Sequence, residues 1–197
     1  MSLPARLFAP EMTRKPATYA DLEALPSNQV GEIVNGELYA SPRPASPHAS
    51  AAWHLGGELY APFDRGRGGP GGWLFLFEPE LHFGEDVLAP DIAGWRRERM
   101  PKVPDVVGFT MAPDWLCEVL SPSTSRLDRV RKLPIYAREG VKHVWLVDPL
   151  QRTLEVFRLA GGHYLLLGTY EDAETVHAEP FEALALELRV LWEDMAE

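Results

Sequence analysis

Residues 115–120, Trp-Leu-Cys-Glu-Val-Leu, form an almost continuous apolar run that contains one carboxylate, Glu118. Such a run predicts a β-strand covered on both faces, because a strand with one solvated face alternates apolar and polar residues. Residues 143–148, His-Val-Trp-Leu-Val-Asp, have the same character. The chain must therefore cover both faces of a sheet with other elements.

Other segments carry signals of helices, turns and further strands. Thr18 and Asp21 resemble a capping box, and Asn35-Gly36 between apolar residues is typical of a hairpin turn. Helices are expected over 18–25, 46–63 and 126–140, with Ser46 as the N-cap of the second and Pro134 bending the third. Strands are expected over 73–77, 81–83, 87–95, 115–120, 143–148, 153–159 and 163–171, with a glycine-rich loop over 64–72. This order predicts an α/β (α+β) fold, a mixed β-sheet flanked by helices.

Length and composition favour one folded domain. The chain has 197 residues, of which 46% are apolar and 24% charged. The proline-containing residues 1–16 are expected to be a flexible arm, and residues 17–197 a single domain. Because no apolar stretch approaches the roughly 18 residues of a membrane span and no secretory signal is recognisable, we expect a cytoplasmic protein without a membrane partner. The single cysteine, Cys117, cannot form an internal disulfide.

The net charge of −10 is unevenly distributed along the chain. Residues 171–197 form an acidic C-terminal segment that holds nine acids against Arg189 alone, a local net charge of −8. The rest of the chain carries only −2. A nucleic acid is compatible with that body, since attraction to phosphate is local and is screened over about 10 Å. Charge therefore neither supports nor excludes such a partner.

Glu118 is the sharpest chemical feature of the sequence. With alternating side chains it shares a strand face with Leu116 and Leu120, whereas Cys117 and its neighbours take the other face. An ionised carboxylate costs several kcal/mol in apolar surroundings unless a cation or hydrogen bonds compensate. Two interpretations remain open: a functional carboxylate, or one held by an arginine or reaching water at the sheet end.

Asp91 is a second acid in apolar surroundings, in the segment Val-Leu-Ala-Pro-Asp-Ile-Ala-Gly-Trp. Asp91 and Glu118 could together hold one divalent cation, because Mg²⁺ takes a few carboxylates plus water and phosphate oxygens. Mn²⁺ is a possible substitute. The alternative for Asp91 is turn formation beside Pro90.

Lys132 is the candidate cation near these acids. Asp128, Lys132 and Tyr136 recur every four residues and form a stripe along one flank of the predicted helix. A cation there could stabilise charge that develops at phosphorus. The alternative is an exposed Asp–Lys pair worth about 0.3–0.5 kcal/mol. At 100° per residue, Lys132 lies roughly opposite the apolar stripe 127/130/134/137/141, which favours exposure unless the helix is buried on two sides.

Two segments carry a family resemblance. Pro-Asp-Ile-Ala-Gly-Trp at 90–95, and residues 115–149, resemble the bacterial Uma-two family of endonucleases in the PD-(D/E)XK nuclease superfamily, over roughly Tyr19 to Val156. The resemblance implies a restriction-endonuclease-like fold with Asp91 and Glu118 as the motif acids. The usual lysine position, two residues after the second acid, holds Leu120, and the resemblance implies that Lys132 supplies this charge from the following helix.

The resemblance also extends the candidate site to Glu32 and His48, which sit where the family carries an acid and a histidine. From the residues alone, a solvated hairpin carboxylate and a polar residue at a helix start remain open for them. The resulting hypothesis is a Mg²⁺-dependent endonuclease acting on nucleic acid, most readily DNA, and working as a homodimer.

Two rival hypotheses are kept. The negative charge and Leu120 at the lysine position favour a catalytically inactive nuclease-fold module that binds nucleic acid or a partner protein. The acidic segment 171–197 also permits a structural subunit that contacts a basic protein.

Overall fold

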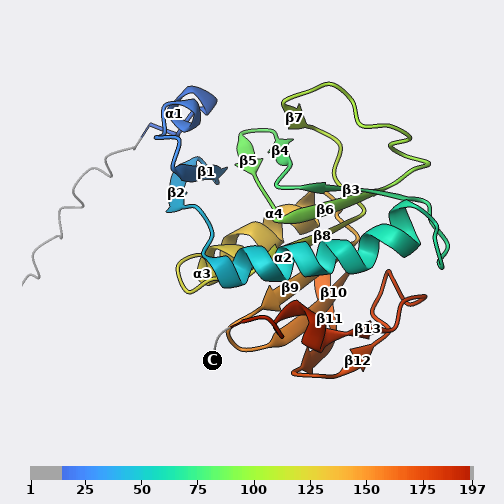
Figure 1. The fold of residues 1–197 in the computed structure, drawn as a ribbon. Coiled ribbons are helices and arrows are strands. Elements are labelled where there is room, and N and C mark those ends of the chain that lie inside the picture. Colours follow the sequence, from blue (N-terminus) through green and yellow to red (C-terminus); the bar gives the residue numbers. More distant parts are fainter. Residues whose placement is uncertain (1–14, 196–197) are drawn as a thin grey trace, which may run out of the picture.

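The computed structural model describes residues 15–195, so nearly all of the expected N-terminal arm, residues 1–16, lies outside the described residues. A five-stranded sheet contains, in spatial order, β2 (Glu37–Pro42), β1 (Gln29–Val34), β5 (Asp86–Leu88), β4 (Glu80–Phe83) and β7 (Gly108–Phe109). A six-stranded sheet contains β11 (His163–Glu171), β10 (Thr153–Ala160), β9 (His143–Asp148), β8 (Trp115–Val119), β6 (Ile92–Arg96) and β3 (Trp73–Phe77). A small ribbon pairs β12 (Thr175–Val176) with β13 (Leu186–Glu187) (Figure 1).

Both larger sheets are mixed. Strand β8 runs parallel to β9, and β4 parallel to β7, whereas the other strand pairs are antiparallel. The expected α/β class, with mixed strands flanked by helices, is therefore confirmed. The strands form two larger sheets, and the prediction of a single strand over 87–95 was wrong, because this segment is split into β5 and β6, which belong to different sheets. The break falls at Pro90, which has no amide hydrogen to donate to a strand ladder.

The helices are short apart from α2. They are α1 (Tyr19–Glu23), α2 (Ser46–Leu59), the π-helical turn η1 (Tyr60–Asp64), α3 (Ser125–Leu127), the π-helical turn η2 (Asp128–Lys132), α4 (Leu133–Arg138) and the 3₁₀ turn η3 (Leu188–Leu191). The capping box of α1 at Thr18 is confirmed, but α2 has Ala45 rather than Ser46 as its N-cap. Within residues 15–195, none of the helices has the length and apolarity that crossing a bilayer demands.

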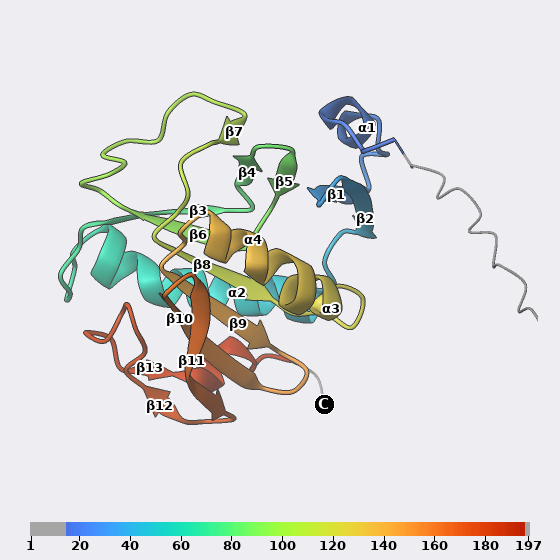
Figure 2. The same cartoon turned by 180° about the vertical axis from the view of Figure 1, so that it is seen from behind.

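The helices cover opposite faces of the six-stranded sheet. Helix α2 runs across the front in Figure 1, and α4 lies in front when the molecule is seen from behind in Figure 2. The core is divided accordingly: Trp115 and Cys117 pack on the α2 side, whereas Leu116 and Leu120 pack with Tyr136 on the α4 side. This is the alternation that the sequence predicts for β8, and Cys117 is buried as expected.

The helical segment α3–η2–α4 buries a different face from the one predicted. Lys132 is only 2% exposed, whereas Val130, a member of the expected apolar stripe, is 56% exposed. The π-helical turn widens the helix immediately before Pro134, whose ring cannot occupy a regular helix interior. The expected distortion is thus present, and the inward face carries Asp128, Lys132 and Tyr136 instead of apolar residues alone.

The acidic C-terminal segment is part of the core. The Phe181 ring packs 4.9 Å from Trp73, 5.1 Å from Trp115 and 5.5 Å from Trp145, measured between ring centroids. Leu186, Leu188 and Leu191 are also buried, and the charged residues between them face outward. Removing residues 171–197 would therefore expose the core, which makes this segment unsuitable as a detachable docking tail.

Asp114 fixes strand β8 beside β6. Its Oδ2 accepts hydrogen bonds from the Arg96 amide at 2.9 Å and from Arg99 at 2.8 Å, and its Oδ1 accepts one from Lys142 Nζ at 2.9 Å. Burial acts to raise the pKa of Asp114, but these donors outweigh it and leave the pKa below its ordinary value. The position of β8 in the sheet thus depends partly on one ionised carboxylate.

Asp114→Asn is expected to lower the free energy of unfolding by about 1.5–3 kcal/mol near neutral pH, because charge-assisted hydrogen bonds are lost. Since the folded-state pKa is depressed, the carboxylate stabilises the fold fully above its unfolded pKa of about 3.9, and this contribution is lost as pH falls through the folded pKa. Urea unfolding of both proteins at about pH 7 and about pH 2.5 measures the effect. The exposed Asp105→Asn is the matched control. An Asp114→Asn deficit that is equally large at both pH values would contradict this account.

Candidate active site

Glu118 occupies a buried position near the C-terminal end of β8 and faces the helical segment α3–η2–α4. Its Oε1 lies 2.8 Å from Lys132 Nζ and accepts a hydrogen bond of 2.5 Å from the Tyr136 hydroxyl. The side chains of Glu118 and Lys132 are almost completely buried. The expectation that this carboxylate has a compensating partner is therefore met, by a lysine from the neighbouring helix.

Lys132 is shared among three carboxylates. Besides Glu118, its Nζ lies 2.9 Å from Glu32 Oε1 on β1 and 3.1 Å from Asp128 Oδ1 one turn earlier in its own helix. An ammonium group has three N–H donors, so these contacts use all of them. Lysine suits such a point because its charge is compact, whereas the planar guanidinium of arginine is best matched to paired oxygens.

The cluster carries more negative than positive charge. Burial raises the pKa of Glu118 well above its ordinary value; Lys132 opposes this rise, and the nearby carboxylates of Asp128, Asp91 and Glu32 add to it. Burial acts to lower the pKa of Lys132, but Glu118 and Glu32 reverse this effect and hold the pKa well above its ordinary value. Lys132 is therefore a permanent cation in a group of acids that it does not fully neutralise.

Asp91 lies in the break between β5 and β6, directly before the strand that pairs with β8. The pairing of Ile92 with Cys117 places Asp91 opposite Glu118 on the adjacent strand. Asp91 Oδ2 accepts a hydrogen bond of 2.7 Å from the Val119 amide, and this bond holds its carboxylate at the end of β8. The two acids predicted from the sequence therefore lie close together at the same end of two neighbouring interior strands, β6 and β8.

His48, in the first turn of α2, contacts the other oxygen of Asp91. Its Nε2 lies 3.2 Å from Asp91 Oδ1. Burial acts to lower the pKa of His48, but the hydrogen bond to Asp91 outweighs burial, so the pKa is raised. The Nδ1 atom of the same ring is buried and makes no hydrogen bond that meets strict geometry among the described residues, but the Val119 backbone also contributes to the raised pKa of His48.

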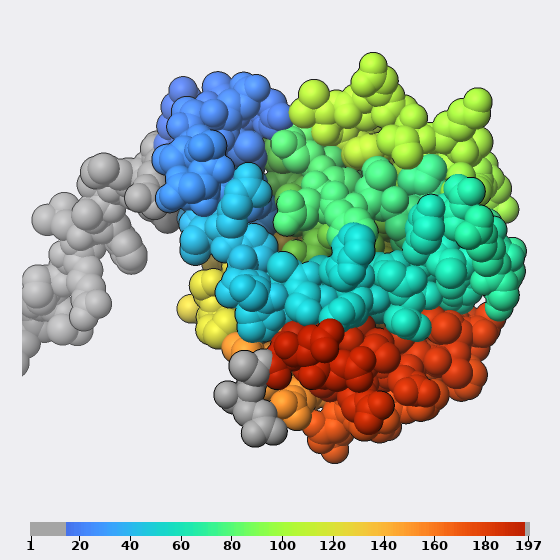
Figure 3. Space-filling model, viewed as in Figure 1, coloured from blue at the N-terminus to red at the C-terminus, as the bar shows by residue number. Residues whose placement is uncertain are grey.

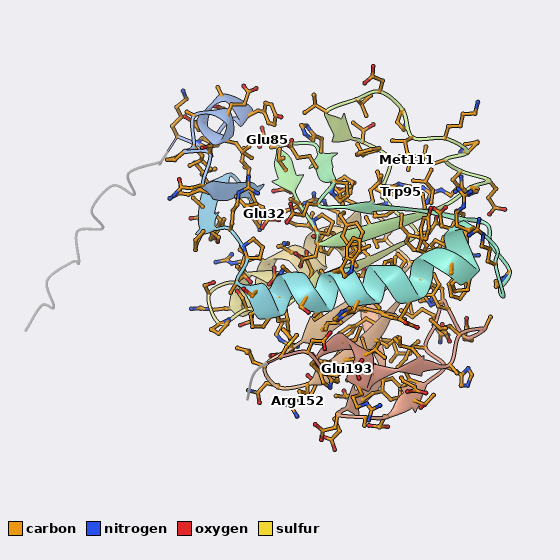
Figure 4. All side chains as sticks on the ribbon, viewed as in Figure 1. Glu32, Glu85, Trp95, Met111, Arg152 and Glu193 are labelled. Carbon is orange, nitrogen blue, oxygen red and sulfur yellow. The ribbon has the colours of Figure 1, made fainter. Side chains whose placement is uncertain are left out.

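Glu32 joins the cluster from the five-stranded sheet. Its Oε1 accepts a hydrogen bond of 2.8 Å from the Ala89 amide in addition to the Lys132 contact. Figure 4 shows Glu32 on the side of the β1–β2 hairpin that faces the body of the molecule. The solvated hairpin position that the sequence left open for Glu32 is therefore not the one it adopts.

These side chains line one cavity of about 320 Å³. Figure 3 shows a hollow between the β1–β2 hairpin and the β4–β5 region, above the beginning of α2. The cavity is bounded by Glu32, His48, Asp91, Glu118, Asp128 and Lys132, and also by Arg43, Glu78 and the hydroxyl-bearing residues Ser121, Ser123 and Thr124. Sequence reasoning gave Asp128 and Tyr136 no site role, although their four-residue spacing with Lys132 was visible.

The donor set fits a hard divalent cation that keeps much of its water shell. Glu118 Oε2 has no protein partner among the described residues, and Asp91 Oδ1 is bonded only to His48. Between residues 15 and 195, no group of three or more His, Cys, Asp or Glu side chains is arranged to enclose a metal ion. Two carboxylates with water and substrate oxygens are nonetheless the usual ligands of Mg²⁺. Asp91 and Glu118 are the two carboxylates of the cavity that could serve as such ligands.

Comparison with known proteins identifies relatives of the chain. Residues 16–190 match the model of the Uma2 family, described as "Putative restriction endonuclease". A solved structure from Anabaena variabilis ATCC 29413, titled as a putative nuclease belonging to DUF820, is similar with a TM-score of 0.73 and 21% identity, covering 90% of this chain and 98% of that chain. A comparison with curated proteins finds no match.

The similarity of the two structures shows a shared fold, and the mixed β-sheet flanked by helices that the sequence predicts is confirmed. The resemblance carried by residues 90–95 and 115–149 lies within the segment that the family model matches. Because that model spans most of the sequence, the chain belongs to the Uma2 family of putative restriction endonucleases.

Proposed function

We propose that this protein is a metal-dependent endonuclease that hydrolyses phosphodiester bonds of nucleic acid, most readily DNA. The observation that carries the proposal is the convergence of Asp91 and Glu118 in one cavity, with Lys132 beside Glu118. Family membership supports nuclease chemistry. The excess of carboxylates over cations in the cavity supports a requirement for Mg²⁺, with Mn²⁺ as a substitute.

The residues of the chain have separate tasks in this proposal. Asp91 and Glu118 would hold the ion, and a bound ion would supply polarisation of the scissile phosphate and activation of a water nucleophile. His48 and the Val119 amide fix the two oxygens of Asp91. In the overall reaction the water oxygen bonds to phosphorus and one P–O ester bond breaks, which leaves a phosphate monoester and a free hydroxyl group.

Lys132 acts as a positioning residue in this proposal. Its three donors already contact Glu32, Glu118 and Asp128, so a direct contact with the phosphate requires that one of them be given up. Arg43 is better placed to contact a phosphate. It lines the cavity, is exposed, and its guanidinium makes a contact of 3.4 Å with the Ser27 carbonyl.

A second candidate is a nuclease-fold module that binds nucleic acid or a partner protein without turnover. The observation that favours it is the same set of contacts, because a lysine saturated by carboxylates is not available to stabilise a transition state. Metal-dependent cleavage that is lost when Asp91 is replaced separates the candidates, since an inactive module cleaves nothing whether or not it binds a divalent ion.

Asp91→Asn is expected to reduce cleavage of plasmid and single-stranded DNA in Mg²⁺ or Mn²⁺ by more than about 100-fold. Loss of a residue that only supports a metal ligand costs about 10- to 100-fold, and this substitution weakens a proposed ligand itself. Glu118→Gln is expected to behave in the same way. Gel assays of cleavage, together with calorimetric titration of Mn²⁺ into each protein, measure the effect.

Asp105→Asn, in an exposed loop, is the matched control and should retain both metal binding and cleavage. Circular dichroism checks that every variant is folded. Cleavage that is equal in Asp91→Asn and the wild type, or absent from the wild type on all substrates, would refute the endonuclease proposal. Mn²⁺ binding without any cleavage would leave an inactive metal-binding relative.

Lys132→Met is expected to lower the free energy of unfolding by about 3–5 kcal/mol, because it leaves buried carboxylates without their cation. Glu118→Gln should cost less, since Lys132 keeps two other partners. The double variant should therefore be more stable than the sum of the single effects predicts, by about 0.5–3 kcal/mol. Urea unfolding of the four proteins measures this coupling, and the exposed Lys102→Met is the control. Strict additivity would show that the pair is not energetically coupled.

A further inference from the structure

The most exposed aromatic side chains lie on helix α2, on its continuation η1, and on the strand end next to α2. Among the described residues, the three aromatic side chains that are largely exposed are Trp53 at 70%, Tyr60 at 52% and Phe77 at 49%. Trp53 lies on α2, Tyr60 on the turn η1 that continues this helix, and Phe77 at the end of β3. Trp53 and Tyr60 are seven residues apart, a spacing that places them near one helix face.

Trp53 and Phe77 form a flat apolar surface. Their ring planes are inclined by 26°, and the ring centroids are 6.5 Å apart. Phe77 reaches the helix because Gly56 has no side chain: a Cβ atom at that position would lie 2.3 Å from the Cζ atom of Phe77. The glycine therefore allows the Phe77 ring to lie against α2, beside Trp53, with about half of its surface left in water.

This aromatic surface adjoins the candidate active site. Trp53 and Phe77 line a smaller cavity of about 160 Å³, whose other walls include His48, Glu78 and Asp91. His48, Glu78 and Asp91 also line the larger cavity, which contains Glu118. Trp53 is five residues after His48, which corresponds to about 7.5 Å along the helix axis. A nucleic-acid strand with a phosphate at Asp91 would therefore have its neighbouring nucleotide within reach of the Trp53 and Phe77 rings.

We propose that Trp53 and Phe77 stack against an unpaired base next to the scissile phosphate, so that the preferred substrate is single-stranded nucleic acid. This inference rests on the proposed function of the site. Aromatic rings beside a strand-binding groove hold bases by stacking, which tolerates any sequence because every base has a π-face. In an intact duplex these faces are covered by neighbouring base pairs, so the platform selects unpaired strands.

Stacking would add to whatever phosphate attraction the site has. With a net charge of −10, the chain has little general attraction for the phosphates of either a duplex or a single strand. Stacking on Trp53 and Phe77 is a source of affinity that only unpaired bases can use. Arg43, which lines the larger cavity, remains available as a local phosphate contact.

Trp53 provides a direct spectroscopic signal for this contact. The chain has six tryptophans, and the other five are at most 3% exposed. A base stacked on Trp53 is therefore expected to quench the exposed component of the tryptophan fluorescence. The full-length protein is titrated in EDTA, which prevents cleavage, with an unlabelled single-stranded DNA oligonucleotide of about 20 nucleotides, with the matching duplex, and with an oligonucleotide of abasic residues.

The wild type should be quenched by the single strand, and much less by the duplex or the abasic strand. In fluorescence anisotropy with a labelled single strand, Trp53→Ala and Phe77→Ala should each bind about 5- to 150-fold more weakly. Trp53→Phe should retain most of the affinity, because a ring is still present. Val107→Ala, which changes an exposed apolar residue of another surface, is the matched control.

Unchanged single-strand affinity in Trp53→Ala and Phe77→Ala would overturn the inference, as would equal binding of duplex and single strand. The inference would also fail if the aromatic surface pairs two copies of the chain. In that case Trp53→Ala would elute from size-exclusion chromatography as a smaller species than the wild type, with the same affinity for the single strand. If the wild type cleaves DNA but these variants bind normally, only this inference fails. If binding depends on Trp53 but no metal supports cleavage, the endonuclease proposal fails and the base-binding surface stands.

Discussion

The buried ammonium group of Lys132 is the contact on which the arrangement of the site depends. It joins Glu32 from the five-stranded sheet, Glu118 from the six-stranded sheet and Asp128 from its own helix. Three parts of the fold therefore meet at one charge. Removing an ammonium group from water costs several kcal/mol, and this cost is recovered only when each N–H donor is paired. Close packing of the three elements around Lys132 therefore favours the arrangement in which all three carboxylates contact its Nζ atom.

Asp91 is fixed by a different set of contacts. Its carboxylate is held by the Val119 amide and by His48, and the break at Pro90 removes it from the regular strand ladder. The two carboxylates are thus held in different ways: Glu118 by a buried cation, and Asp91 by a backbone amide and a histidine. Rigid carboxylates with an unneutralised negative charge are a suitable arrangement for a divalent ion, which needs oxygen ligands and tolerates few of them from protein.

Much of the fold follows from local sequence patterns. The Asn35-Gly36 hairpin, the Thr18 capping box and the two faces of β8 were predictable because each depends on the chemistry of a few adjacent residues. The burial of Lys132 was not predictable from a helical wheel. It depends on the π-helical turn before Pro134, and on acids from strands more than ten residues away in the sequence. The aromatic surface beside Asp91 was also missed, because Trp53 and Phe77 are brought together only by Gly56 and the packing of β3 on α2.

The central claim is that Asp91 and Glu118 share a divalent ion while Lys132 keeps Glu118 in place. Crystals of the wild-type protein soaked in Mn²⁺, with data collected near the manganese absorption edge, test it most directly. The account predicts an anomalous peak between the Asp91 and Glu118 carboxylates, with the Lys132 ammonium still in contact with Glu118. Absence of any peak at these carboxylates, or a peak only at sites remote from the cavity, would contradict it.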